Sequence, residues 1–202
     1  NSTNPYQLTE ADRTVIGNTT PKFSGGFGLN ATYKGFDMSM FFNFMYDFDV
    51  LNANKIMLTT WADNKENNFL MDIASDKRWR NFDDMGNEIR YSPEVLAEFN
   101  KNATMWNPTS IGRPICMSYA VEDGSFLRLN SATLGYTLPS VWTKKVGLSK
   151  VRFYVSGNNL FTLTGYSGYD PEVNIATGLT PNIDYNRYPR SRTYTFGAQL
   201  TF

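Results

Sequence analysis

Two short stretches of this sequence gather side chains that could bind a ligand. The stretch "GYSGYDPEV" brings Tyr166, Tyr169 and Asp170 close together along the chain. Aromatic rings can stack on a sugar ring, and a carboxylate can accept hydrogen bonds from its hydroxyl groups. We therefore expect these three residues, together with Trp106, to contribute to substrate binding. One alternative stays open: Tyr169 and the dipeptide Asp170–Pro171 can instead shape the turn at the start of this loop.

The second stretch, "NFDDMGNE", collects oxygen-bearing side chains at Asp83, Asp84, Asn87 and Glu88. Carboxylate and amide oxygens are the ligands that Ca²⁺ prefers, but their spacing here does not follow that of an EF-hand loop. A solvated acidic turn is therefore the favoured interpretation, and we predict no metal site.

The sequence offers little for catalysis. It contains no histidine, which is the commonest general base and a frequent metal ligand. Its single cysteine, Cys116, cannot form an internal disulfide. We therefore predict no catalytic residue and no cofactor, and we expect that the protein is not an enzyme. Basic and acidic residues balance at 19 each, so no charged surface for nucleic acid is expected.

The elements that must carry these residues are strands. Apolar and polar residues alternate in five segments, at about 23–34, 36–48, 125–138, 150–164 and 190–202. These runs are about 12 residues long, whereas a typical soluble strand has about 5–6 residues and a tilted membrane strand about 9–11. No run approaches the roughly 18 apolar residues of a membrane-spanning helix. The length of the runs favours membrane strands.

The connections between these segments differ in length in a regular way. Short turns at "KGFD" and "SVWTKKVG" alternate with longer loops at about 1–22, 49–124 and 165–189. If the last strand ends at the periplasm, every short turn is periplasmic and every long loop is extracellular. This arrangement is typical of outer-membrane barrels.

Local signals add detail to this scheme. Gly35 suits the positive φ of a tight turn, and a change of parity near Asn130–Ser131 suggests a β-bulge. Within the long loop, "SPEVLAEFNKN" predicts a helix capped by Ser92 with Pro93 at its first position. A second helix is predicted over "NNFLMDIASDKRW".

Aromatic residues are expected to form girdles at both ends of the membrane strands. The inner girdle is predicted at Tyr33, Phe36, Tyr136 and Phe202, and the outer girdle at Tyr46, Phe48 and Phe161. Arg190 and Arg192 fall on the lipid-facing parity, at the outer end of the last strand, where a charge costs little or meets anionic headgroups.

Five strands cannot close a barrel, and an open sheet edge is not tolerated against lipid because its backbone groups find no partner. We therefore expect the chain to be the C-terminal part of a larger antiparallel β-barrel whose other strands precede Asn1.

Once the strands are placed, four phrases resemble the SusC/RagA family of TonB-dependent outer-membrane transporters. They cover nearly the whole chain apart from the loop at about 52–119, and they occur in order. They read "DRTVIGNTTPKFSGGFGLNATYKGFDMSMFF", "VEDGSFLRLNSATLGYTLP", "VRFYVSGNNLFTLTGYSGYDPEV" and "DYNRYPRSRTYTFGAQLTF".

The resemblance implies a transmembrane barrel of about 22 strands around an N-terminal plug. It implies active import of oligosaccharides or peptides, powered by the TonB–ExbB–ExbD complex and assisted by a SusD-like surface lipoprotein. It also implies that the aromatic last strand, with Tyr194, Phe196 and Phe202, is the signal read by the barrel-assembly machinery. Two alternatives remain: a soluble carbohydrate-binding β-sandwich, and a barrel-embedded hydrolase.

Overall fold

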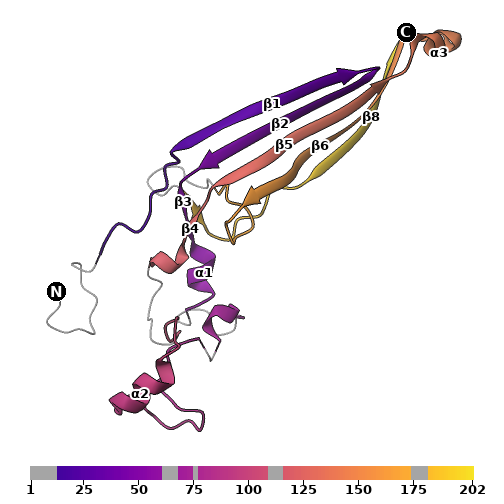
Figure 1. Cartoon of the computed structure of the whole chain (residues 1–202). Coiled ribbons are helices and arrows are strands. Elements are labelled where there is room, and N and C mark those ends of the chain that lie inside the picture. Colours follow the sequence, from indigo (N-terminus) through magenta and orange to yellow (C-terminus); the bar gives the residue numbers. More distant parts are fainter. Residues whose placement is uncertain (1–12, 61–67, 75–76, 109–115, 174–181) are drawn as a thin grey trace. The chain divides into compact units, whose positions relative to one another are not determined.

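The computed structural model describes residues 13–60, 68–74, 77–108, 116–173 and 182–202. Five long strands form one antiparallel sheet in the order β1-β2-β5-β6-β8 (Figure 1). These strands are β1 (Phe23–Tyr33), β2 (Phe36–Tyr46), β5 (Phe126–Thr137), β6 (Lys150–Thr164) and β8 (Thr193–Thr201). The expectation of an antiparallel, all-β fold is confirmed, and the sheet is open in this chain.

The other elements are short. A second sheet has three strands in the order β4-β3-β7, and helices occur in the connections. The elements are β3 (Asp49–Asn52), α1 (Ala53–Met57), η2 (Met71–Ile73), α2 (Pro93–Asn100), η3 (Ser118–Ala120), β4 (Val121–Asp123), α3 (Ser140–Thr143), η4 (Lys144–Val146) and β7 (Ile183–Asp184). None of the helices in the described ranges is long and apolar enough to cross a membrane.

The chain divides into two compact units, which are described separately. One unit holds residues 1–50, 121–183 and 187–202 and contains the five-stranded sheet. The other holds residues 51–120 and 184–186. The predicted helix at Pro93 is present in this second unit as α2, with Ser92 at its N-cap. The predicted second helix is wrong in the described residues: only the turn η2 forms, because the backbone becomes extended again at Ala74 (φ −55°, ψ 155°).

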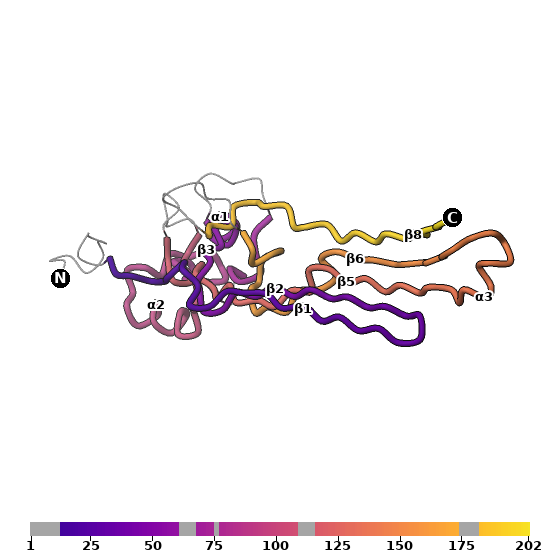
Figure 2. The backbone as a smooth tube through the Cα atoms, turned by 90° about the horizontal axis from the view of Figure 1, so that it is seen from above, coloured from indigo at the N-terminus to yellow at the C-terminus, as the bar shows by residue number. Residues whose placement is uncertain are grey.

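Short and long connections lie at opposite ends of the five-stranded sheet, because all of its strands are antiparallel (Figures 1 and 2). The turn end carries the Lys34–Gly35 turn and the 138–149 connection. The loop end carries the 47–125 and 165–192 segments. Lys34 and Gly35 have φ values of 46° and 88°, which is the positive φ at both central residues that a two-residue type I′ hairpin requires.

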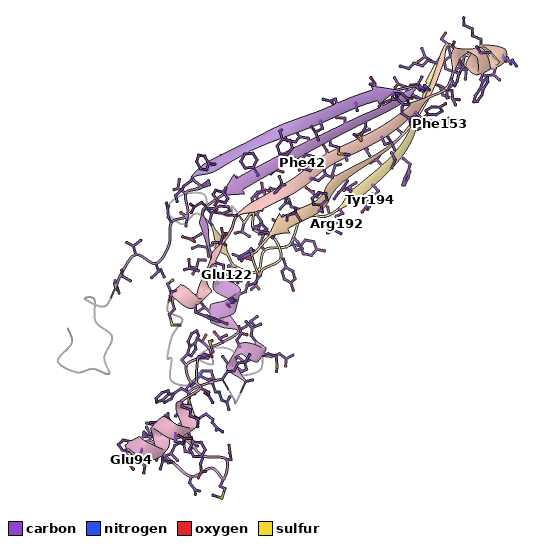
Figure 3. All side chains as sticks on the ribbon, in the orientation of Figure 1. Phe42, Glu94, Glu122, Phe153, Arg192 and Tyr194 are labelled. Carbon is purple, nitrogen blue, oxygen red and sulfur yellow. The ribbon has the colours of Figure 1, made fainter. Side chains whose placement is uncertain are left out.

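The register places apolar residues of all five strands on one face, here called the apolar face. Side chains project from both faces of this sheet, and Phe42, Phe153 and Tyr194 mark its apolar face (Figure 3). Near the turn end one row of register partners crosses four neighbouring strands and is entirely aromatic. The row reads Tyr33, Phe36, Tyr136 and Phe153. The rings of Phe36 and Tyr136 lie 4.5 Å apart between centroids.

The change of parity in the third strand is explained by an irregularity at Asn130. Phe41 pairs with Ser131 and Phe42 with Leu129, so β5 carries one extra residue opposite β2. On its other side Asn130 faces an irregularity in β6, where Asn159 has a φ of 53°. The extra residue returns Leu127 and Leu129 to the apolar face, as the predicted bulge requires.

The opposite face, here called the polar face, holds large side chains over glycines of neighbouring strands. The guanidinium of Arg152 on β6 forms a bidentate ion pair with Asp37 on β2, with Nε donating to Oδ1 at 2.9 Å. The pair passes over Gly135 of β5, where a Cβ would overlap both groups. In the same way the ring of Tyr154 covers Gly197. A side chain at either glycine would displace these contacts.

The 47–125 segment leaves and re-enters the sheet through a narrow neck. The N–H of Asp47 donates to Oγ of Ser125 at 2.8 Å, and the N–H of Gly124 donates to the carbonyl of Phe48 at 2.8 Å. Asp47 has a φ of 59°, which reverses the alternation at the end of β2. Phe48 is consequently buried in a core cluster. Its parity predicted a place in the outer aromatic girdle, and that prediction is wrong.

Candidate functional site

The best-defined cluster of charged residues lies at the loop end of the polar face. Its centre is Arg128, which β5 holds between Leu127 and Leu129 and which is only 2% exposed. A buried guanidinium requires partners, because an unpaired charge is costly away from water. The partners come from the loop after β6, and they fix that loop on the sheet.

Asp170 is the main partner of Arg128. Its Oδ1 accepts a hydrogen bond from Nη2 of Arg128 and another, at 3.0 Å, from the backbone N–H of Glu172. The backbone of Arg190 also donates to this carboxylate. Burial alone would raise the pKa of Asp170, but these hydrogen bonds and the nearby guanidinium together hold its pKa below the ordinary value of 3.8. Asp170 is therefore an ionised structural anchor.

Glu172 extends the cluster to a second arginine. Its Oε2 lies 3.7 Å from Nε of Arg128, and its Oε1 accepts a hydrogen bond at 2.7 Å from Nη2 of Arg190. Neither Nε of Arg128 nor Oε2 of Glu172 makes a hydrogen bond within the described part of the chain. The cluster thus alternates in charge, and it joins β5, the loop after β6 and the segment before β8. We call Arg128, Asp170, Glu172 and Arg190 the loop anchor.

An apolar cluster stands beside the loop anchor in the same unit. Tyr166 belongs to it with the buried residues Phe48, Val50, Phe126 and Val173. Gly168 lies directly against the Tyr166 ring, where a Cβ would overlap it. The ring is thus enclosed by its own loop.

The residues predicted to bind substrate differ in burial and lie in two different units of the chain. Tyr166 and Asp170 are buried, and only Tyr169 presents its side chain to the outside, at 83% exposure. The open alternative, that Asp170 shapes the loop, matches its hydrogen bonds. Trp106 lies in the other unit, where its indole N–H donates to the carbonyl of Thr59 at 3.2 Å and its ring meets Tyr119 edge-on at 5.2 Å.

The last strand carries the predicted assembly residues on its apolar face. Tyr194 and Phe196 alternate with threonines along β8, and Phe202 follows the strand directly. All three side chains are exposed. Their role in barrel assembly stays a prediction.

Arg190 and Arg192 lie before β8, which begins at Thr193, and the expected lipid-facing position is wrong for Arg190. Arg190 turns instead to Glu172, because a mostly buried carboxylate attracts it. Arg192 is exposed, and Figure 3 labels it at the loop end. Arg128 and Glu172 were missed by sequence reasoning. The signal available was an arginine inside an apolar strand and the acidic pair in "DPE".

The acidic turn at 81–88 has the geometry of a closed hairpin. Oδ1 of Asp83 accepts hydrogen bonds from the N–H groups of Met85 and Asn87, at 2.9 and 2.8 Å, and Asp84 pairs with Arg80. These hydrogen bonds hold the pKa of Asp83 below its ordinary value, with the side-chain amide of Asn87 as the largest cause. Among the residues that the structure describes, no group of His, Cys, Asp or Glu side chains could hold a metal ion.

The chain was compared with known proteins. No protein-family profile matches it. It is 35% identical over 202 residues to the TonB-dependent receptor P3 of Formosa agariphila. This match covers 97% of this chain and 18% of that receptor. It is 38% identical over 88 residues to the TonB-dependent receptor SusC of Bacteroides thetaiotaomicron, covering 42% of this chain and 8% of SusC.

Comparison with solved structures agrees with the comparison of sequences. A chain of the RagAB peptide importer in its closed-closed state superimposes with a TM-score of 0.74 at 25% identity, over 97% of this chain and 19% of that chain. The present chain thus spans about a fifth of the length of these relatives. Its open antiparallel sheet matches part of the β-barrel of a TonB-dependent transporter. The chain belongs to the SusC/RagA family of TonB-dependent receptors.

Proposed function

We propose that this chain supplies wall strands and extracellular loops to an outer-membrane transporter that imports oligosaccharides or peptides. The observation that carries the proposal is the apolar face of the five-stranded sheet. Aromatic and aliphatic side chains are exposed along it on every strand, which suits contact with lipid and is costly in water.

The dimensions of the sheet support a membrane position. Strands β1 and β2 each have 11 residues, which matches the roughly 9–11 residues of a tilted membrane strand. The aromatic row at the turn end has a counterpart at the loop end, where Phe23 stacks on Tyr46. We assign the turn end to the periplasm and the loop end to the outside, because barrels of this class have short periplasmic turns and long outer loops.

The proposed mechanism is import of a captured ligand. A SusD-like lipoprotein closes over the extracellular loops, and TonB with ExbB and ExbD then displaces a plug that other parts of the receptor provide. This chain contributes no chemistry in that cycle. The barrel-assembly machinery recognises the strand that bears Tyr194, Phe196 and Phe202.

Within this function, Tyr169 is the strongest candidate for ligand contact among the residues predicted from the sequence. The loop anchor and the apolar cluster hold the loop while leaving its ring exposed. Tyr166 and Asp170 fix the backbone beside Tyr169 through their buried contacts, and Trp106 is a separate candidate for ligand contact in the other unit. An exposed aromatic ring on a fixed backbone stacks on a sugar or an aromatic peptide side chain at low entropic cost.

A soluble β-sandwich is the weaker alternative. A sandwich buries the inner face of each sheet against the other, whereas aromatic side chains on the apolar face here are exposed within the described residues. A barrel-embedded hydrolase would need an acid–base site, and the histidine-free sequence lacks the commonest general base. The names of the relatives, which are receptors and importers, also favour transport over catalysis.

Uptake by cells that lack the complete gene tests the proposal. We expect uptake of either fluorescent oligosaccharides or fluorescent peptides to fall to background, and the wild-type uptake to stop when an uncoupler removes the proton gradient that energises TonB. Complementation with Tyr169→Ala is expected to lower affinity for the ligand without lowering the amount of receptor in the outer membrane. The proposal would be overturned if the protein were recovered in the soluble fraction and if cells without the gene took up both ligand classes as well as wild-type cells do.

A further inference from the structure

The connection between β5 and β6 is a folded structure, not a simple turn. It contains α3 and η4, and Figure 1 shows α3 beyond the ends of these strands. The N–H of Leu148 donates to the carbonyl of Thr143 at 3.0 Å, and Gly147 ends η4 with a φ of 74°. Thr143 is 2% exposed, so the connection has a buried side. Its outward side is therefore held in a defined orientation.

The outward side of this connection carries three large apolar side chains. Val141, Trp142 and Val146 are 68%, 60% and 71% exposed. Residues four positions apart on a helical turn share a side, so Val141 lies next to the position of Lys145 and Trp142 next to that of Val146. Exposed valine and tryptophan side chains in a short ordered connection are unfavourable in water and suit the interfacial zone of a membrane.

Two lysines lie beside these apolar residues. Lys144 and Lys145 both belong to η4. Neither Lys144 nor Lys145 forms an ion pair with any described residue, and both are exposed. The carboxylate on this part of β2, Asp37, is already paired with Arg152. Lys144 and Lys145 thus form a basic surface with no acidic partner among the described residues.

The connection joins β5 and β6 at the turn end of the sheet. Tyr136 and Phe153, which are register partners on the apolar face, lie near this end of the two strands. A membrane that covers these rings would place its headgroup layer next to the connection. A lysine near an aromatic ring at this level keeps its ammonium in the headgroups while its stem lies along apolar surface.

We propose that the connection from Ser140 to Gly147 is a binding surface for anionic phospholipid headgroups of the periplasmic leaflet. The inference rests on the proposed membrane position of the sheet. Val141, Trp142 and Val146 enter the interface, and Lys144 and Lys145 bind the phosphate and the acidic headgroup. The charge of the lysines selects an anionic lipid over a zwitterionic lipid of equal chain length.

The test uses the complete receptor, purified in detergent, and native mass spectrometry of its lipid adducts. Phosphatidylglycerol and phosphatidylcholine with identical acyl chains are added in turn. For the double variant Lys144→Gln/Lys145→Gln we expect roughly tenfold weaker retention of phosphatidylglycerol and unchanged retention of phosphatidylcholine. The variant Trp142→Ser is expected to weaken retention of both lipids.

A matched control removes the same charge elsewhere. Lys77→Gln/Lys101→Gln changes two exposed lysines of the other unit and is expected to leave lipid retention unchanged. Equal retention of phosphatidylglycerol by the wild type and the Lys144/Lys145 variant would overturn the inference, as would an equal loss in the control. A receptor that inserts and transports normally but shows no preference for phosphatidylglycerol rejects this inference alone. A receptor that never enters the membrane rejects the proposed function itself.

Discussion

The two faces of the five-stranded sheet are built by alternate residues of the same strands, but they are stabilised in different ways. On the polar face, directed contacts link separate elements: Arg152 on β6 reaches Asp37 on β2 over Gly135, and Arg128 on β5 reaches Asp170 in a loop. On the apolar face, aromatic rows lie side by side and remain exposed.

The difference shows that the stability of the polar face depends on detailed geometry more than that of the apolar face does. A hydrogen-bonded ion pair depends on the distance and angle of particular atoms, so a change in one partner leaves the other unsatisfied. Contact with an apolar medium is non-directional and depends mainly on area. The polar face should therefore be sensitive to shape and to lost partners, and the apolar face mainly to charge.

The largest effect is expected from Arg128→Met. The substitution leaves Asp170 and Glu172 mostly buried without their central cation, and removal of one partner of such a group costs about 3–5 kcal/mol. Urea unfolding of the complete receptor in detergent measures the loss. Arg192→Met, at an exposed arginine, is the control and should change the free energy of unfolding by less than about 0.5 kcal/mol. Similar losses in both variants would show that the loop anchor contributes nothing.

A lysine introduced at either of two adjacent positions, in separate variants, distinguishes the two faces directly. Met40 lies on the apolar face near the middle of β2, and Ser39 lies beside it on the polar face. Met40→Lys should destabilise the receptor in a lipid bilayer by about 2–4 kcal/mol, because a charge near the bilayer centre is poorly solvated. Ser39→Lys should be nearly neutral. Reversal of this order, measured by unfolding in lipid vesicles, would exchange the assignments of the two faces.

A smaller effect is expected from one methyl group on the polar face. Gly197→Ala places a Cβ into the ring of Tyr154, and overpacking of this kind costs about 1–3 kcal/mol. Gly28→Ala is the matched control, because its Cβ would lie 3.6 Å from the nearest atom, the carbonyl oxygen of Met40. The control should be neutral or slightly stabilising in the same unfolding measurement. Equal destabilisation would mean that strand glycines matter for their backbone alone.

The smallest effect concerns pH. The pKa of Asp170 is lower in the folded protein than its ordinary value of 3.8, so the carboxylate contributes stability above that value. This contribution is lost as the pH falls through the lower, folded pKa. The stability difference between the wild type and Asp170→Asn should therefore be largest above pH 4 and shrink below it. It should remain modest because Glu172 stays beside Arg128. A difference independent of pH would exclude an ionised Asp170.

Much of the sheet could be predicted because its signals are local. Alternation identified the apolar parity of Phe36 to Tyr46, and a single change of parity located the bulge at Asn130. Gly35 was recognised as a turn residue, and its φ is 88°. Each of these features depends on residues that are neighbours in sequence, so one chain is enough to read them.

The loop anchor could not be predicted because its partners are distant in sequence. Arg128 and Asp170 are 42 positions apart, and a charged residue on a polar face is equally consistent with exposure to water. The burial of Phe48 was missed for a different reason. The positive φ of Asp47 reverses the alternation, and nothing in the pattern of side chains announces it.

The narrow neck of the 47–125 segment has a consequence for how such receptors diversify. Because hydrogen bonds from Asp47 and Gly124 already close the ends of this insertion, its length and content are uncoupled from the register of β2 and β5. The entropic penalty of a longer insertion grows only logarithmically, by about 0.6 kcal/mol for each doubling. Gene segments that encode different insertions can therefore be exchanged at this neck during evolution, giving new surface loops on an unchanged wall.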